Sequence, residues 1–181
     1  NVGGSITEVL NLDGGTLQFA NNAATTLAGP VVLQADSTIN VTGTGANHLI
    51  TGEIYGYGND LTINRSGGTS RVTMAPAATT GARWGNTTIN VGAALQVGNN
   101  SRGWLGTGDV ANNGDLIMNV NDGHYVVGNE ISGAGNFTQS RGTVYLTADN
   151  TYLGTTTVGL QTVNAGASLR IGNDTYTGMH G

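Results

Sequence analysis

Apolar residues in this chain recur at every second position over short runs. Leu61 and Ile63 form one such run, and Leu116, Met118 and Val120 form another. Because successive side chains of a strand point to opposite faces, this spacing predicts strands with one buried face. Gly and Asn separate the runs, as expected for tight turns. No apolar spacing of three and four residues continues beyond two helical turns, so the pattern predicts an all-β protein.

Two stretches of the chain, at about 54–99 and 131–173, resemble each other. Ile54–Asn59 matches Ile131–Asn136 at an offset of 77 residues, and Thr88–Asn99 matches Thr162–Asn173 at an offset of 74. A period of this length is too long for one turn of a solenoid, but it suits three coils of roughly 20 to 25 residues each. Repeats that cannot bury a core alone must stack on one another.

A parallel β-helix explains these features better than an aligned β-sandwich, which would also show alternating strands and Gly-rich turns. The strands are short, and Asn recurs at matching turn positions, in the pairs Asn90/Asn164 and Asn99/Asn173. Coils in a solenoid lie about 4.8 Å apart, so such amides could hydrogen-bond along the rod. We therefore expect residues 1–181 to form a single β-helix of roughly eight coils.

The core of this rod is predicted to be a narrow column of Val, Ile and Leu. Larger side chains fill it at Phe19, Met74 and Phe137. The strongest predicted strand pair of the first copy has the inward residues Ile89, Val91, Leu95 and Val97.

Composition narrows the possible functions. The chain has 31 Gly, only 2 Pro, no Cys and a net charge of −5, and all 6 basic residues are Arg. The negative charge argues against a nucleic-acid partner, because binding phosphates requires a basic patch. Without Cys there is no disulfide framework and no thiolate site. No apolar run approaches the ~20 residues of a membrane span, and no N-terminal signal peptide is present, so an exported protein would be a mature or excised fragment.

The most regular part of the chain carries a family resemblance. Gly133–Thr138, Gly142–Leu146, Asn150–Val158 and Asn164–Asn173 together resemble the autotransporter-associated β-strand repeat, found in passenger domains of Gram-negative type V autotransporters. The likeness covers roughly residues 31–181. The first copy departs from it at residues 77–81 and where Arg83 and Trp84 intervene.

This resemblance implies a right-handed, single-stranded parallel β-helix displayed outside the cell. It also implies a longer passenger domain, anchored by a C-terminal outer-membrane barrel that this chain does not contain. The fragment itself is therefore not expected to insert into a membrane.

No pattern of metal ligands or cofactor-binding residues stands out. His48, His124 and His180 are scattered without ligand spacing, so we expect structural roles for them and no metal or cofactor. The segment 56–60 is similar to a calcium-binding nonapeptide of another β-helix class, but it occurs once and Thr62 replaces the apolar residue that this motif needs.

The acidic residues favour turns over catalysis. Asp36, Asp60, Asp109, Asp122 and Asp149 all fall at predicted turns, where Asp is common for conformational reasons. A glycan-cleaving solenoid would need two carboxylates on one face, and such a pair could still assemble across coils. The prediction is that the chain is not an enzyme, with a polysaccharide-processing enzyme as the least favoured alternative.

Aromatic and Arg side chains supply the candidate binding residues. They concentrate where the repeat is least regular, and such side chains are enriched at binding hot spots. The other interpretation is that the two Trp side chains plug the core beneath a long loop. The candidates are Tyr55, Tyr57, Arg83, Trp84, Arg102 and Trp104.

These observations lead to an expected function. The chain is predicted to be a non-catalytic adhesin on the bacterial surface that binds host cells, matrix proteins or glycans. The alternative is a structural stalk or self-association module, in which the partner is a second copy of the chain. In the first case, changes at the loops carrying Trp84 and Trp104 should abolish adhesion. In the second, charge reversal along a coil face should abolish clumping.

Overall fold

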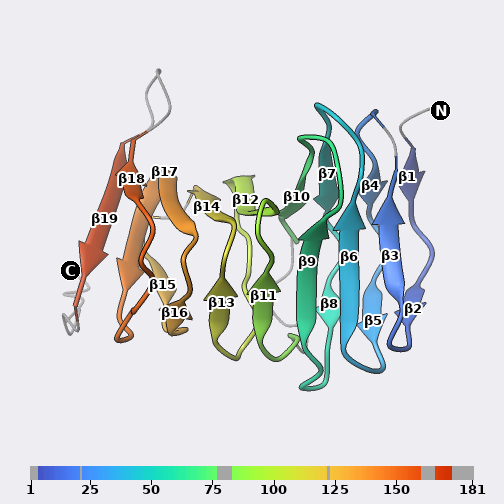
Figure 1. The fold of residues 1–181 in the computed structure, drawn as a ribbon, viewed down its shortest axis with the longest axis horizontal. Coiled ribbons are helices and arrows are strands. Elements are labelled where there is room, and N and C mark those ends of the chain that lie inside the picture. The colour runs from blue at the N-terminus through green and yellow to red at the C-terminus, as the bar shows by residue number, and fades with distance from the viewer. Residues whose placement is uncertain (1–3, 21, 77–82, 122, 160–165, 173–181) are drawn as a thin grey trace, which may run out of the picture.

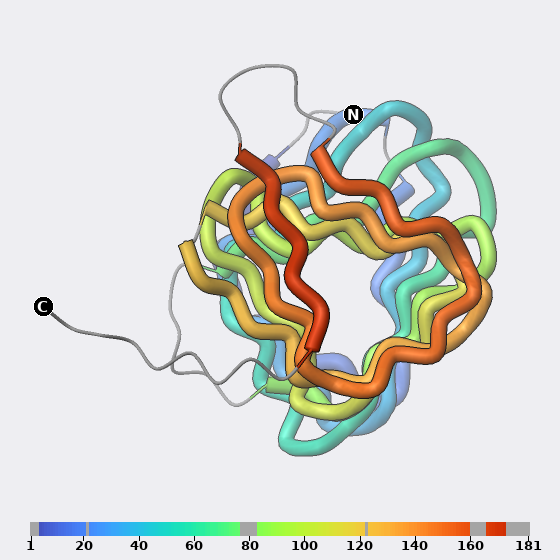
Figure 2. Tube along the Cα trace, turned by 90° about the vertical axis from the view of Figure 1, so that its left-hand side faces the viewer, coloured from blue at the N-terminus to red at the C-terminus, as the bar shows by residue number. Residues whose placement is uncertain are grey.

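The computed structural model describes residues 4–20, 22–76, 83–121, 123–159 and 166–172. These residues form a right-handed parallel β-helix of about 7 turns, close to the roughly eight coils expected. All described strand pairs are parallel and no helix occurs in the described ranges, so the all-β prediction is confirmed. The strands stack along the length of the rod (Figure 1), and a view along the rod shows successive coils lying over one another (Figure 2).

Coil length follows from the register of the stacked strands. Successive partners along one side are 21, 23, 24, 23, 21, 21 and 19 residues apart, close to the predicted length. The partners that define these coils are Ser5, Thr26, Leu49, Thr73, Gln96, Ile117, Thr138 and Thr157.

Each complete coil runs along three sides of the rod, which we call A, B and C in chain order. The A side is a continuous ladder from one end of the described structure to the other. Its strands are β1 (Ser5–Ile6), β4 (Thr26–Leu27), β7 (Asn47–Ile50), β10 (Arg71–Met74), β12 (Ala94–Ser101), β14 (Asp115–Val120), the first part of β17 (Asn136–Leu146) and β18 (Thr156–Val158).

The C side is also continuous and contains six strands. They lie in front in Figure 1. In chain order they are β3 (Thr16–Phe19), β6 (Ser37–Val41), β9 (Leu61–Arg65), β11 (Thr87–Ile89), β13 (Val110–Asn112) and β16 (Ile131–Ser132).

The B side is interrupted. Three strands lie at its N-terminal part, and its ladder resumes only after two coils whose described residues place no strand there. In those two coils the chain passes through Arg83–Trp84 and Trp104–Leu105. The strands before the gap are β2 (Leu10–Leu12), β5 (Val31–Leu33) and β8 (Ile54–Tyr55); those after it are β15 (Tyr125–Val127), the second part of β17 and β19 (Ala167–Ile171).

The core is the predicted column of aliphatic side chains. Phe19, Met74 and Phe137 are buried in it, as expected. Val91 is the exception: its side chain is 81% exposed, so the prediction that it faces inward is wrong. The chain turns here, because the N–H of Ala93 donates to the carbonyl oxygen of Asn90 at 2.9 Å and Gly92 has a φ of 78°. The alternation therefore ends at Asn90.

The two sequence copies do not occupy the same columns. Ile54 pairs with Val31 on the B side, whereas its counterpart Ile131 pairs with Val110 on the C side. Three coils from Leu49 to Ile117 take only 68 residues, fewer than the offsets of 74 and 77. The copies are therefore displaced by about one side of the rod as well as by three coils.

An amide ladder runs along the C side. Nδ2 of Asn64 donates to Oδ1 of Asn40 at 3.1 Å, and Nδ2 of Asn90 donates to Oδ1 of Asn64 at 3.2 Å. Stacked Asn amides were predicted, although Asn164 and Asn173, the partners expected from the sequence, lie outside the described residues.

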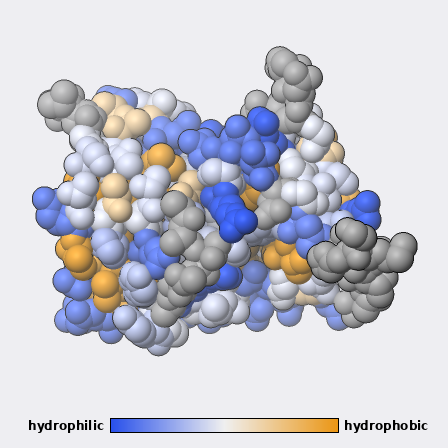
Figure 3. Space-filling model, turned by 180° about the vertical axis from the view of Figure 1, so that it is seen from behind, coloured by the Kyte–Doolittle hydropathy of each residue, from blue (hydrophilic) through white to orange (hydrophobic). Residues whose placement is uncertain are grey.

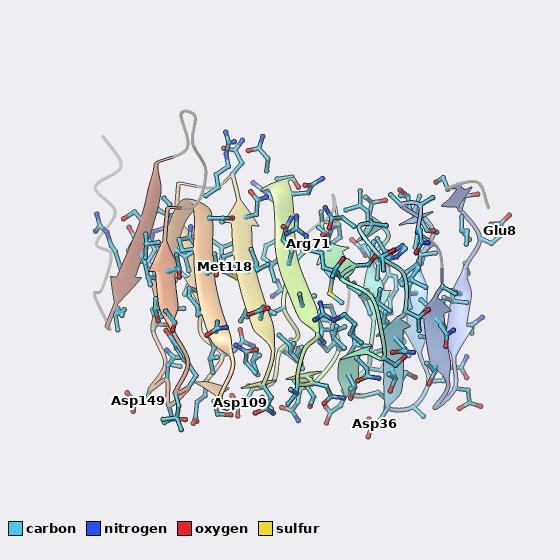
Figure 4. The ribbon with its side chains drawn as sticks, turned by 45° about the horizontal axis from the view of Figure 1, so that its top comes forward. Glu8, Asp36, Arg71, Asp109, Met118 and Asp149 are labelled. Carbon is cyan, nitrogen blue, oxygen red and sulfur yellow. The ribbon has the colours of Figure 1, made fainter. Side chains whose placement is uncertain are left out.

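A second polar column marks the corner before the C side. Each carboxylate or amide oxygen accepts the backbone N–H of the equivalent residue one coil further on. The Asp36 carboxylate accepts from Asp60 at 2.8 Å, Asp60 from Asn86 at 2.7 Å, and Asn86 from Asp109 at 2.9 Å. Asp36 and Asp109 lie along one edge of the rod (Figure 4). This bonding gives Asp36 and Asp60 a structural role at the corner of the coils.

Candidate binding surface

Trp84 fills the core where the B side lacks a strand. Its side chain is 2% exposed, and its indole Nε1–H donates to the Thr87 hydroxyl at 2.8 Å. The coil beneath approaches so closely that a Cβ atom on Gly56 would lie 2.1 Å from the Trp84 Cα atom. Of the two interpretations of Trp84, the core plug describes what the structure shows. This residue can influence a ligand only by supporting the surface above it.

Tyr55 and Tyr57 stand on either side of that contact. Their ring centroids are 6.5 Å apart at an interplanar angle of 24°. Tyr57 is 72% exposed and has a φ of 51°, in the left-handed region that bulky residues rarely occupy. Such strain persists only where the surroundings enforce it, and it is concentrated at functional sites. The fold thus holds a large aromatic ring in solvent at a conformational cost.

Arg83 and Trp104 form a second pair on the next two coils. The guanidinium carbon of Arg83 lies 4.3 Å from the centroid of the Trp104 ring. This distance falls within the range of a cation–π interaction. The Trp104 ring in turn lies 6.0 Å from the ring of Tyr125, which is buried. Trp104 is therefore held between an Arg above it and a core aromatic residue beneath.

A carboxylate adds a polar group beside the tyrosines. A hydrogen bond to the Glu53 carboxylate raises the pKa of the Tyr55 hydroxyl, and partial desolvation adds to this shift. Carboxylates, Arg and aromatic faces close together can bind sugar hydroxyls and rings, or peptide groups and apolar side chains.

We call Tyr55, Tyr57, Arg83 and Trp104 the aromatic strip. Because Gly56 contacts Trp84, the tyrosine pair and Arg83 lie on adjacent coils. Four of the six candidate residues thus gather on the interrupted B side. Arg102 is exposed just before Trp104, and no side-chain bond or ring contact joins it to another described residue.

Sequence reasoning missed the supporting roles of Glu53 and Tyr125. Tyr125 reaches Trp104 only because the two rings lie on neighbouring coils, 21 residues apart in the chain. No local motif links them. Glu53 precedes Tyr55 by two residues, a spacing that places both side chains on one face of a strand and could have suggested their contact.

The remaining surface is largely polar. Figure 3 shows small, separate apolar patches among hydrophilic residues on one face of the rod. Over the described part of the chain, no group of three or more His, Asp or Glu residues is placed to hold a metal ion. The same ranges contain no helix long and apolar enough to cross a membrane.

Comparison with known proteins gave no relative. No protein-family model, curated protein or solved structure matches this chain.

Proposed function

We propose that this chain is a non-catalytic binding module, an adhesin that is displayed on a bacterial surface as part of an autotransporter passenger domain. It binds a glycan or a protein on host cells or in the extracellular matrix through the aromatic strip. The observation that carries this proposal is the strained, exposed ring of Tyr57 beside Tyr55, next to the Arg83–Trp104 pair.

The side chains of the aromatic strip are better suited to binding a ligand than to catalysing a reaction. Aromatic rings provide large contact areas at a low entropic cost, and Arg adds directional donors. The acids Asp36, Asp60 and Asp109 have carboxylate oxygens bonded to backbone N–H groups of neighbouring coils. The autotransporter assignment rests on the repeat-like motifs together with the observed β-helix.

The test is binding by the folded chain to cultured host cells, a panel of matrix proteins and a glycan array. The Tyr57→Gly and Trp104→Ala variants and their double variant are compared with Leu153→Ala, which truncates an exposed apolar residue outside the strip. We expect saturable binding that weakens by at least ~10-fold in each single variant, because a lost hot-spot side chain costs about 2 kcal/mol or more.

Two results would contradict the proposal. Binding that survives in the double variant moves the site away from the aromatic strip. No binding to any surface, together with concentration-dependent association of the chain with itself, supports the self-association alternative instead. Circular dichroism of every variant shows whether a loss reflects the surface or the fold.

A further inference from the structure

The outside of the A side contains a second candidate site, away from the aromatic strip. It is a hollow of about 160 Å³ that spans β4, β7 and β10 and reaches Asn99, which lies within the irregular stretch of β12 between Val97 and Ser101. Its lining includes Arg71, Thr26, Thr73, Asn47 and Asn99, with Leu49 and Ala24 as the apolar members. The register explains this grouping, because Asn47 pairs with Arg71 and Leu49 pairs with both Thr73 and Thr26.

Among the described residues that line this hollow, Arg71 is the only charged one. Its side chain is half-buried, and its Nε–H group is buried without a hydrogen-bond partner. Neither a hydrogen bond nor an ion pair joins its guanidinium to any residue within the described ranges. Burial lowers the pKa of Arg71, and no neighbouring carboxylate opposes this shift.

Two other Arg residues of the rod, unlike Arg71, lie over aromatic rings. Arg83 lies over Trp104, and Arg170 lies over Tyr145 at 5.3 Å. A desolvated guanidinium that lacks such a contact is unfavourable unless something satisfies its donors. Its planar set of N–H groups matches the oxygens of a carboxylate or sulfate.

The neutral polar residues of the lining provide further hydrogen-bond donors beside Arg71. Thr and Asn side chains can each donate a hydrogen bond to an anion oxygen, and none of the described lining residues is acidic and competes for Arg71. Thr73 is only 2% exposed, so one of these hydroxyl-bearing residues is fixed by the fold. The hollow is smaller than the 300–1,000 Å³ of a typical ligand pocket, so it fits one group of a ligand.

We propose that Arg71, with Thr73, Asn47 and Asn99, binds an anionic oxygen group, a carboxylate or sulfate, that is carried by an acidic glycan or free in solution. Figure 4 places Arg71 near the middle of the rod, where a long ligand could extend along the coils on either side. This site is independent of the aromatic strip.

The experiment titrates the whole chain with sodium sulfate and sodium acetate at constant ionic strength, with sodium chloride as the balancing salt. The readout is the NMR signals of the Arg Nε–H groups and of the backbone N–H groups of Asn47, Thr73 and Asn99, which remain observable when Arg71 is replaced. We expect the Arg71 signal to shift saturably with a Kd of about 1–10 mM, as is reasonable for a ligand of so few atoms. Parallel titrations use a sulfated heparin-derived hexasaccharide and a neutral chitin hexasaccharide.

Variants assign the site. Arg71→Met removes the donors and should weaken sulfate binding at least ~10-fold, whereas Arg65→Met, also at a half-buried Arg, should not change it. Asn99→Asp adds a competing carboxylate at an exposed position, so it should abolish binding even if Arg71→Met fails to fold. Trp104→Ala should have no effect, which separates this site from the aromatic strip.

The outcomes distinguish the possible sources of the anion. Tighter binding of the sulfated hexasaccharide than of sulfate, lost in Asn99→Asp, identifies an acidic glycan. Sulfate binding without that gain identifies a free anion. Equal shifts of all Arg signals with salt, or unchanged binding in both Arg71→Met and Asn99→Asp, would show ionic screening only and overturn the proposal.

Discussion

The B and C sides of the rod belong to the same coils but differ in regularity. On the C side, six strands stack without a gap, and the amide ladder and acid column join neighbouring coils. On the B side, the described residues of two coils form no strand and include Trp84 and Trp104 instead. The regular side can satisfy its backbone groups by repetition, whereas the interrupted side depends on particular side chains. Its surface is consequently free to differ from coil to coil.

The largest expected effect on the free energy of unfolding concerns Trp84, which fills the core at a position on the B side where no strand is described. Trp84→Ala should reduce the free energy of unfolding by about 3–5 kcal/mol, because it empties a core position and removes the bond to Thr87. Urea denaturation measures this change.

Two further variants calibrate this result. Ile89→Ala removes a buried side chain from the C side of the same coil and should cost about 2–5 kcal/mol. Trp84→Phe keeps most of the volume and should cost less than Trp84→Ala. A loss below about 1 kcal/mol for Trp84→Ala would mean that the B side contributes little to the core.

The amide ladder gives the next largest expected effect. Asn64 both donates to Asn40 and accepts from Asn90, so Asn64→Ala leaves the Asn90 side-chain amide without its acceptor and Asn40 Oδ1 with the Ser66 hydroxyl as its remaining donor. We expect a loss of about 1–3 kcal/mol in the free energy of unfolding. Asn121→Ala, at an exposed position, should change it by less than about 0.5 kcal/mol. Equal effects of the two substitutions would show that stacked amides do not stabilise the C side.

The contrast between the sides also explains what could be predicted from sequence. Local alternation was sufficient to place core residues such as Ile63 and Met118, because strand geometry fixes which face each side chain occupies. It failed at Val91, where a turn rather than a strand follows Asn90. Alternation cannot reveal where a strand ends when the next residue is also apolar.

Relations between coils were harder to predict. Coil length varies between 19 and 24 residues, so a sequence offset does not reveal which residues stack. The contact between the tilted rings of Trp104 and Tyr125 depends on this lateral register and has no local signature. By contrast, clusters of Trp, Tyr and Arg in irregular segments did indicate where the aromatic strip would lie. Irregularity in a repeat was therefore the more useful signal for the site, and regularity the more useful signal for the fold.

His48 is a polar exception inside the regular coils. Its imidazole is fully buried, is stacked on Phe19 at 4.5 Å, and has no hydrogen-bond partner at either ring nitrogen. Burial lowers the pKa of His48 below its ordinary value of 6.5. Below pH 6.5 the unfolded chain therefore takes up more protons at this residue than the folded chain does.

The stability contributed by neutral His48 is present above pH 6.5 and is lost progressively as the pH falls toward the lowered pKa of the folded state. The slope for this one residue can reach at most about 1.4 kcal/mol per pH unit. Urea denaturation between pH 7.5 and pH 5 measures it, in a range where most carboxylates stay ionised. His48→Leu should flatten the curve. Equal slopes in the two proteins would show that His48 is not the group responsible.

The smallest expected change in stability has the opposite sign and lies on the B side. Tyr57 has a φ of 51° and its side chain is 72% exposed. Burial of its ring therefore offsets little of the energetic cost of this strained backbone conformation. Glycine adopts this backbone conformation readily, and Tyr57→Gly should raise the free energy of unfolding by up to about 1 kcal/mol. Tyr55→Ala provides the control, because it removes the stacked neighbour without touching the strained position. A more stable Tyr57→Gly variant that binds less well would show that the interrupted side gives up stability for a binding surface. A less stable one would mean that the Tyr57 ring supports the fold through its contact with Tyr55.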